Sequence, residues 1–501
     1  MDTQPDSPAV VRVLWITAAA AAIGFGTLYL YVACSRIGFP FDLEWGEGLF
    51  VDHVARVVRG QSIYVEPSIN FVPLVYTPGY YYLAAGAALV FGVGIATLRA
   101  VSIGCSLALF GLLIAFGRRE CGRTIDAVVL AGVVAGCYAI SGAWLDIARV
   151  DALLLLLVFG AAFLVRHREG TASLIAAGAL LAAAALTKQV ALTLAPPVLL
   201  YAVIRHGRRG LVASASWAGA LAVGIALLQR ESHGWFLYYT FTVLSKAQTA
   251  WTERPMAFWT SDLFGRFPIG TAMGLAWSAI AWRFSAWRDW TFHVVFTWGV
   301  LMSTWEARIH PGAWFNTLIP ALIVLALGMV RLARVVDLQV PGLGGGLVVA
   351  QLALLVYNPS SFIPGPTQWK AAADVVDLMR RVPGDVLFAD HAWWSTLAGK
   401  RSHVHEMPMR DLFAAHDAWG DRLRDQVRRA IEAQQFDLII QDSPDWFAVP
   451  LGSHYQPFGQ LLPVRTALRQ QVGNPIYPAT VYLPRRRSVQ WPPAPLAQEP
   501  H

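Results

Sequence analysis

Four carboxylates occur within twelve residues in the stretch FDLEWGEGLFVD (41–52), in a chain in which only 14% of residues are charged. Glu44 and Glu47 are three residues apart, so they can share one face of a helical turn. A carboxylate held among aromatic side chains has a pKa that its surroundings can shift, which suits a general base. The stretch therefore makes Glu47 the first candidate for a catalytic base and Glu44 its alternative. The simpler interpretation is that these acids, like Asp42 and Asp52, are only solvated.

Further charged groups stand at the ends of apolar runs. The stretch WLDIARVDALL places Asp146, Arg149 and Asp151 at the start of one run. Acids there can simply stabilise a helix N-terminus. Asp151 is also the next candidate for the base, and the pair Asp146 and Asp151 is a weak candidate for a divalent metal site. Lys188, between two apolar runs, either extends toward lipid head groups or is functional.

The stretch STWEARIHPGAWFN adds a second group of cations. Arg308 and His310 can bind an anionic group, or Arg308 can simply pair with Glu306. Tyr76 and Tyr80 can form the walls of a binding site, although tyrosines also gather at any membrane interface. The sequence has no phosphate-binding glycine loop, HExxH or GxSxG motif. Its four cysteines show no disulfide or metal-ligand spacing.

The elements that must position these side chains are apolar. The chain is 56% hydrophobic with a mean hydropathy of +0.47. It contains about eleven apolar runs near the length of roughly 20 residues that a membrane-crossing helix needs. The last 143 residues, in contrast, carry 15 Lys/Arg and 14 Asp/Glu. We therefore expect a transmembrane domain over 1–358 and a water-exposed domain over 359–501.

Five basic clusters predict the topology of the apolar runs. They lie at 117–124, 166–171, 205–210, 283–289 and 331–337. Basic loops of this kind are typical of the cytoplasmic side of a cell (inner) membrane, and nothing in the net charge of +7 indicates a nucleic-acid partner. The candidate side chains, the first outer loop 34–98, the large outer loop 229–265 and the tail then share the outer side. The run 76–95 is expected to lie in or dip into the outer leaflet, with a full crossing as the alternative.

The tail predicts a small α/β domain on the outer side. After a Pro/Ser-rich linker, DVVDLMRRV and RLRDQVRRAIEAQQ have the pattern of helices, whereas DVLFAD and FDLIIQDSP have the pattern of buried strands. The end of the first strand, in DVLFADHAWW, is interpreted as ordinary loop chemistry, with acceptor binding as the minority alternative.

These features resemble the GT-C superfamily of membrane glycosyltransferases, in particular family 39-like proteins with an RgtA/B/C/D-like domain. The resemblance covers roughly residues 11–330 and rests on EWGEGLFVDHVARVVRGQSIY, FVPLVYTPGYYYLAAG and WLDIARVDALL. In the family the first motif is commonly Asp-Glu. By spacing to Gly60, Glu47 stands at the Glu position and Gly46 at the Asp position. The lysine that commonly precedes the second motif is replaced around Val75 and Tyr76.

The resemblance implies an all-α polytopic membrane protein of about 11 transmembrane helices with a small C-terminal α/β extracytoplasmic domain. It implies that a hexosyl or pentosyl group moves from a polyprenyl-phosphate-linked donor to a lipid, glycan or protein acceptor at the outer face, among membrane lipids. A lipid phosphate is already a good leaving group, so the reaction needs a base and cations rather than a strong acid.

Residues of both charge types are available for this reaction. The base is Glu47 or Glu44, with Asp151 next. The substrate-binding candidates are Lys188, Arg308, His310, Arg149, Tyr76 and Tyr80. No cofactor is certain, and a divalent metal is an option. The alternatives are a lipid-linked sugar flippase or transporter, or a catalytically silent glycan-assembly protein. Charges at run ends and the lack of an internal repeat favour the enzyme over a transporter.

Overall fold

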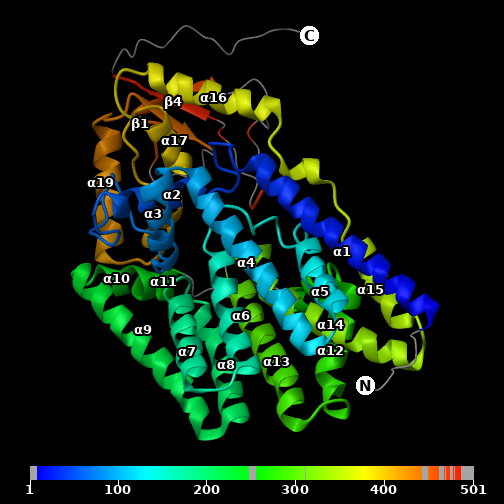
Figure 1. Cartoon of the computed structure of the whole chain (residues 1–501). Helices are drawn as coiled ribbons and strands as arrows, with labels where there is room; N and C mark the ends of the chain where they lie inside the picture. Colours follow the sequence, from blue (N-terminus) through cyan, green and yellow to red (C-terminus); the bar gives the residue numbers. More distant parts are fainter. Residues whose placement is uncertain are drawn as a thin grey trace, which may run out of the picture.

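A computed structural model describes residues 8–247, 255–310, 312–442, 450–461, 470–473 and 480–486, with Leu468 and Pro478. A bundle of helices forms one layer, and a smaller domain with a β-sheet lies over one end of it (Figure 1). The expected fold class, an all-α membrane body with a small C-terminal α/β domain, is confirmed.

The bundle follows the apolar runs of the sequence. Its helices are α1 (Ala9–Arg36), α4 (Ile95–Cys121), α5 (Thr124–Gly136), α6 (Asp151–His167), α7 (Thr171–Ala185), α8 (Ala191–His206), α9 (Leu211–Glu231), α12 (Pro268–Ile280), α13 (Trp287–Ile309), α14 (Ile319–Gln339) and α15 (Leu343–Leu354). Leucine, valine, isoleucine and aromatic side chains lie on the outside of the bundle as well as inside it. Outward apolar faces suit helices whose solvent is lipid. The chain is therefore a multi-pass membrane protein.

Fewer helices than the bundle contains are long and apolar enough to cross a membrane on their own. By length and composition alone, four helical segments of the described chain can cross a membrane, namely Ala9–Arg36, Ile95–Cys121, Ala191–Glu231 and Phe315–Gln339. A bent pair, α15 with the segment Pro359–Arg381, would make a fifth. The shorter apolar helices α5 and α7 need their neighbours to complete a span. The figure of eleven crossings stays a prediction.

The first outer loop forms two helices that pack against each other. Helix α2 (Glu47–Val58) buries Val51 and Val54, and a residue with left-handed backbone, Gly60 (φ 68°), follows its end. Helix α3 (Gly79–Phe91) occupies the run 76–95. Its 13 residues extend about 20 Å at 1.5 Å per residue, less than the roughly 30 Å of a bilayer core. The interpretation of 76–95 as a segment that does not cross stays a prediction.

The large outer loop is helical in part. It contains α10 (Trp235–Leu237), α11 (Leu244–Ala247) and two π-helices, η2 (Tyr238–Val243) and η3 (Phe258–Phe264). Residues 248–254 of this loop lie outside the described residues. The Tyr238 hydroxyl donates to Asp417, so the loop contacts the C-terminal domain.

The C-terminal domain has a four-stranded sheet in the order β1-β2-β4-β3. Its strands are β1 (Val386–Leu387), β2 (Leu438–Gln441), β3 (Tyr455–Gln460) and β4 (Thr480–Pro484), and its helices are α16 (Pro366–Arg381), α17 (Ala392–Leu397), α18 (Glu406–Ala414) and α19 (Ala418–Glu432). The two helices and two strands expected from the tail sequence are present, although residues 443–444 of the second strand motif lie outside the described chain. Strands β1 and β2 are parallel, whereas the unpredicted pair β3 and β4 is antiparallel.

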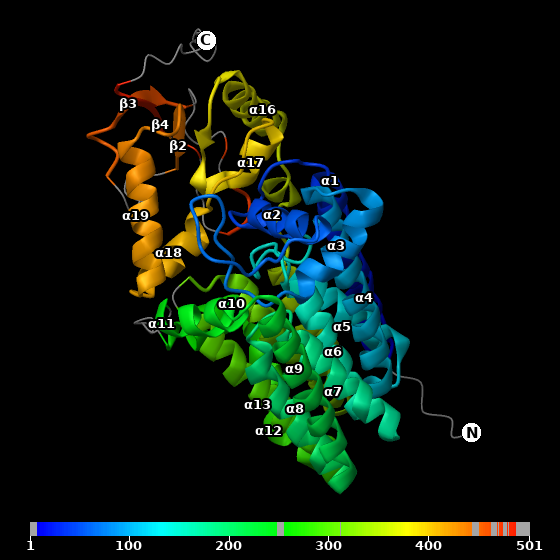
Figure 2. The ribbon, with the colours of Figure 1, turned by 90° about the vertical axis from the view of Figure 1, so that its left-hand side faces the viewer.

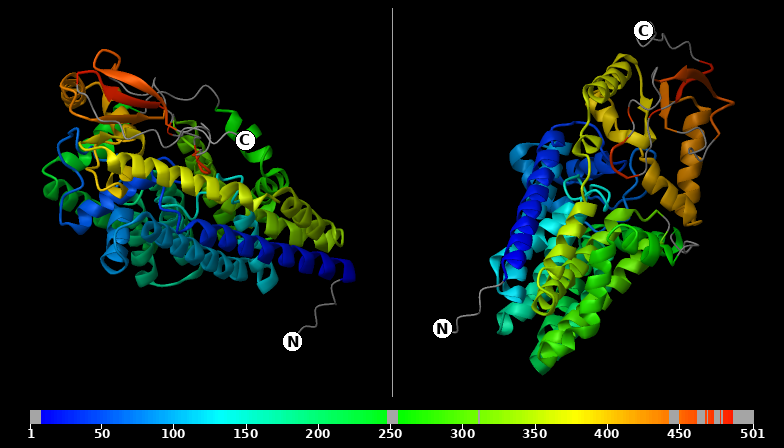
Figure 3. Two further views of the ribbon diagram at one scale, coloured as in Figure 1. Left: turned by 90° about the horizontal axis from the view of Figure 1, so that it is seen from above. Right: turned by 90° about the vertical axis from the view of Figure 1, so that its right-hand side faces the viewer.

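This domain sits on the first outer loop (Figure 2). The imidazole of His391 lies between two carboxylates, 2.9 Å from Asp42 Oδ2 and 3.0 Å from Asp442 Oδ2. Burial alone would lower the pKa of His391, but the two carboxylates raise it to about 10, so the ring is charged at neutral pH. Trp394 Nε1 also donates to Asp42, and Ser402 Oγ donates to Asp52. Views from above and from the side agree that the domain covers this end of the bundle (Figure 3).

Candidate active site

Glu47 is held in place by four hydrogen bonds. Arg99 binds it with two nitrogens, Nε to Oε1 at 2.8 Å and Nη2 to Oε2 at 2.6 Å. The backbone N–H groups of Leu43 and Ala148 donate to the same two oxygens. Burial alone would raise the pKa of Glu47, but Arg99 and these N–H groups hold it below its ordinary value. A carboxylate with both oxygens occupied is a poor proton acceptor, so the geometry argues against the first choice of base.

Glu44, the alternative base, has a freer carboxylate. Its Oε2 accepts from the Gly46 N–H at 3.0 Å and lies 3.3 Å from Arg149 Nη1, whereas its Oε1 accepts no hydrogen bond from a described residue. Burial raises the pKa of Glu44 above its ordinary value, against the opposing effects of Arg149 and the Gly46 N–H. A raised pKa makes the carboxylate a stronger base once it is ionised.

Gly46 gives Arg149 room to approach the backbone. A Cβ on residue 46 would lie 2.2 Å from Arg149 Nη1 and 3.4 Å from Glu44 Oε2. The Glu44 carboxylate thus reaches the space into which a side chain at position 46 would point. Since Gly46 stands where related motifs commonly have Asp, Glu44 can supply the carboxylate that this position lacks.

Arg149 is the cation of this group. Its guanidinium lies over the rings of Phe50 (4.8 Å), Trp144 (5.5 Å) and Tyr76 (5.7 Å), and its Nε has no hydrogen-bond partner. Burial alone would lower the pKa of Arg149, but Glu44 and other neighbours raise it. A buried, charged guanidinium with unused donors is suited to bind an anion.

Asp151 and Lys188 form a second charged pair beside the same tyrosine. Asp151 Oδ1 accepts from Lys188 Nζ at 2.8 Å and from Asn316 Nδ2 at 3.0 Å, and Oδ2 accepts from Trp144 Nε1 at 2.8 Å. Lys188 Nζ lies 5.7 Å from the centre of the Tyr76 ring, on which Arg149 also stacks. Burial alone would lower the pKa of Lys188, but Asp151 raises it. Lys188 therefore keeps its charge and has donors to spare.

The end of the C-terminal domain covers this group. The N–H of Val472 donates to the Leu43 carbonyl at 3.0 Å. A Cβ on Gly473 would lie 3.1 Å from Glu44 Cγ and 3.5 Å from Trp144 Cζ3. His405 Nε2 lies 3.3 Å from the Trp45 carbonyl on the same loop. Two parts of the chain more than 400 residues apart thus meet at Glu44.

Several predicted site residues have other roles. Both oxygens of Asp146 bind Arg36, at 2.7 and 2.6 Å, and Tyr138 donates to it as well. Asp146 therefore does not join Asp151, and the pair does not fit a divalent metal. No cluster of three or more His, Cys, Asp or Glu side chains with metal-binding geometry occurs among the described residues. Tyr80 is buried, with its hydroxyl bonded to the Leu98 carbonyl.

Arg308 and His310 belong to a neighbouring ion-pair group. Arg308 Nε donates to Asp262 Oδ2 at 2.8 Å, a residue of the large outer loop, and not to Glu306. His310 instead pairs with Glu306 at 2.9 Å. Arg308 lies over the ring of Phe315 at 5.0 Å, whereas Arg149 and Lys188 share the ring of Tyr76.

Sequence reasoning missed several residues that shape the site. Arg99, Trp144 and Asn316 were given no role, although each binds Glu47 or Asp151. Only Arg99 had a signal, because it is a lone ionisable residue within the apolar run IATLRAVSIG, where a buried partner is expected. Nothing in the spacing of the other two indicated their contacts.

The chemistry of the group is acid–base and electrostatic. It offers one carboxylate with a free oxygen, Glu44, and two cations, Arg149 and Lys188, that each lie 5.7 Å from the centre of the Tyr76 ring. A base and cations are what transfer from a phosphate leaving group needs. The group lies at the end of the bundle under the C-terminal domain.

Comparisons with known proteins identify the class. Residues 75–230 match the family model described as dolichyl-phosphate-mannose-protein mannosyltransferase. The crystal structure of ArnT from Cupriavidus metallidurans bound to undecaprenyl phosphate has a TM-score of 0.62 at 12% identity, over 92% of this chain and 97% of that chain. The apo form of the same protein has a TM-score of 0.52 at 12% identity, with the same coverage. No curated protein sequence matches the chain significantly.

A more distant structure is the oligosaccharyltransferase of Archaeoglobus fulgidus, with a TM-score of 0.47 at 11% identity over 93% of this chain and 73% of that chain. This likeness is too low to support an argument. The likeness to the ArnT structures shows that this chain has the same fold. The expected resemblance to the GT-C superfamily of membrane glycosyltransferases is confirmed.

Proposed function

We propose that this chain transfers a hexosyl or pentosyl group from a polyprenyl-phosphate-linked donor to a hydroxyl of a lipid, glycan or protein acceptor. The observation that carries the proposal is the meeting of Glu44, Arg149 and Lys188 around Tyr76 in a chain with the GT-C fold. The similar structure of ArnT holds undecaprenyl phosphate, which supports a lipid phosphate as the leaving group.

The proposed reaction assigns one step to each residue. Glu44 Oε1 takes the proton of the acceptor hydroxyl as its oxygen bonds to the anomeric carbon of the donor sugar. The bond between that carbon and the phosphate oxygen breaks, and polyprenyl phosphate leaves with the electron pair. Arg149 and Lys188 stabilise the charge that develops on the phosphate. Asp151 holds Lys188 in position.

The orientation follows from the basic loops. We propose that the protein lies in the inner membrane with the candidate site and the C-terminal domain on the extracytoplasmic side, because basic loops favour the cytoplasm. In a Cys34→Ser, Cys121→Ser background, Glu66→Cys in the first outer loop should react with an impermeant thiol reagent in intact cells. Glu169→Cys, between α6 and α7, should react only after lysis. Labelling of position 169 but not 66 in intact cells would reverse the topology.

Lys188→Met should weaken binding of the lipid-phosphate donor. It removes one charge-assisted contact, so we expect the donor KM to rise about tenfold while the fold survives. Asp151 keeps its bonds to Trp144 and Asn316 in this variant. The control is Lys246→Met, a half-exposed lysine at the same end of the molecule. An unchanged donor KM in the Lys188 variant would leave this lysine with only its structural pairing to Asp151.

The function itself is tested by transfer of radiolabelled sugar. Membranes containing the chain are supplied with labelled polyprenyl-phosphate sugar, and label is followed into lipid, glycan and protein fractions. Label in one fraction, dependent on the intact chain, supports the proposal and names the acceptor class. Movement of labelled donor across sealed vesicles without transfer would instead identify a flippase.

A further inference from the structure

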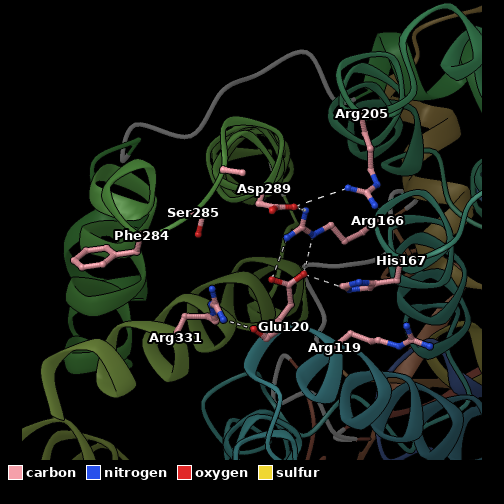
Figure 4. A pocket seen from close by; sticks show the side chains of 10 residues that line it. Arg119, Glu120, Arg166, His167, Arg205, Phe284, Ser285, Asp289 and Arg331 are labelled. Carbon is pink, nitrogen blue, oxygen red and sulfur yellow. Dashed lines mark hydrogen bonds and ion pairs between the residues drawn. The ribbon is translucent and has the colours of Figure 1, made fainter. Parts of the chain in front are cut away.

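A cavity lies at the opposite end of the bundle from the candidate site. Helix α6 connects the two, because Asp151 is its first residue and Arg166 lies at its end. The cavity has a volume of about 430 Å³. Figure 4 shows the side chains that line it. Each of the five basic clusters contributes to its lining, through Arg119, Arg166, Arg205, Ser285 and Arg331. Loops from five places in the sequence therefore share one basic site.

Two acids of this cavity are already neutralised. Arg166 donates to Glu120 Oε1 at 2.8 Å and to Asp289 Oδ1 at 2.6 Å. The rings of His167 and His293 lie 3.3 Å from the same Glu120 carboxylate. This network ties α4, α6 and α13 together. Arg166 makes the closest arginine contact with each of the two carboxylates, which leaves little negative charge for the other arginines.

The remaining arginines are undercompensated. Arg119 makes no hydrogen bond or ion pair with a described residue. Arg331 donates to the backbone carbonyl of Glu120, a neutral partner, and its Nε is buried without a partner. Arg205 pairs with the exposed Glu169 and, at 3.9 Å, with Asp289, and its Nε is also without a partner. An arginine that lacks an acid in such a place is suited to bind a phosphate.

A helix N-terminus adds to the positive potential. The 23-residue helix α13 starts at this cavity, and its N-cap residue, Ala286, offers no side chain to cap the first N–H groups. Ser285 and Ala286 both line the cavity. Free N–H groups and the dipole of a long helix favour an anion at this end.

The surroundings indicate that the anion carries hydrocarbon chains. The aromatic residues Trp282, Phe284 and Trp287 are 58, 50 and 56% exposed on the segment that enters α13, and Phe284 also lines the cavity. Exposed tryptophans of a membrane protein mark the depth of the lipid head groups. A cavity at that depth is open to a lipid that stands beside it.

We propose that this cavity binds the phosphate of an anionic phospholipid from the adjacent leaflet, with Arg119 and Arg331 as its main ligands. Basic pockets between transmembrane helices are recognised sites for such head groups. The lipid would add negative charge where five basic loops repel one another, and would thereby hold α4, α13 and α14 together. This site is separate from the transferase site and does not depend on its chemistry.

The test measures thermal unfolding of the full chain in detergent while phosphatidylglycerol or phosphatidylcholine is added. We expect phosphatidylglycerol to raise the Tm of the wild type, and the double variant Arg119→Gln, Arg331→Gln to need about tenfold more lipid for the same shift. The matched control is Arg208→Gln, Arg209→Gln, which removes two exposed charges from the same end without touching the cavity. The single variant Arg119→Gln loses no contact among the described residues, so it stays informative if the double variant does not fold.

Three results would overturn the proposal. The first is an equal response to phosphatidylglycerol in the cavity variants and the wild type. The second is an equal loss of response in the control pair, which would mean that only net charge matters. The third is a Tm rise with inorganic phosphate as large as that with the lipid, which would assign the cavity to a soluble anion.

Discussion

Glu44→Gln should abolish most transfer activity while leaving the protein folded. The substitution removes the proton acceptor but keeps the side chain's shape and an oxygen that can accept the Gly46 N–H. Loss of a positioned general base typically lowers the rate by about 10²–10⁴-fold. The measurement is the initial rate of sugar transfer from the lipid donor, with donor KM determined in parallel. We expect the effect in kcat, because Glu44 acts on the acceptor.

Two variants control for this result. Glu66→Gln makes the same change at an exposed position of the same loop and should keep full activity. Asp151→Asn alters the next candidate base and, by loosening Lys188, should raise the donor KM more than it lowers kcat. If Glu44→Gln transfers sugar at close to the wild-type rate and Asp151→Asn does not, the base is Asp151.

Glu47→Gln should lower the free energy of unfolding of the protein, and its effect on the transfer rate should be the smaller one. It leaves the Arg99 guanidinium buried without its carboxylate, and breaking a buried pair from one side costs roughly 3–5 kcal/mol. The free energy of unfolding of the purified protein should fall by about that amount, and the yield of folded protein in membranes should fall with it. Activity per folded molecule should drop less than in Glu44→Gln.

A matched substitution in the same helix tests whether the loss is specific. Asp52→Asn changes an acid whose pKa burial raises to about 7. Much of Asp52 is therefore already uncharged at neutral pH, so a neutral asparagine changes its charge little. Its single bond from Ser402 survives in the amide. We expect little change in stability. Equal stability of Glu47→Gln and wild type would show that Arg99 finds other partners.

Hydropathy and charge were enough to predict the architecture. The apolar runs became helices because each carries its own hydrogen bonds and needs only an apolar environment. The sequence also predicted four of the site residues, because ionisable residues at the ends of apolar runs are few. These are Glu44, Arg149, Asp151 and Lys188. The tail strands β1 and β2 followed from short buried patterns, whereas β3 and β4 had no comparable pattern.

The roles of the acids could not be predicted in the same way. Glu47 and Glu44 have the same side chain and lie three residues apart, and what separates their roles is Arg99, 52 residues beyond Glu47. Asp42 is likewise explained only by His391, 349 residues away. Ion pairs of this kind depend on tertiary packing, and the spacing of residues along the sequence does not predict them. Of the four acids in residues 41–52, one has the geometry of a base and the others hold the loop in shape.

The contact between Val472 and Leu43 has a consequence for biosynthesis. A ribosome makes the first outer loop early, yet the partners of Asp42, Leu43 and Trp45 are His391, Val472 and His405, which follow every helix of the bundle. A chain that has threaded α15 into the bilayer still holds an unfinished first outer loop. Assembly of the candidate site must therefore wait until the C-terminal domain has been made and has folded, and a chain interrupted during synthesis leaves the membrane with an incomplete intermediate.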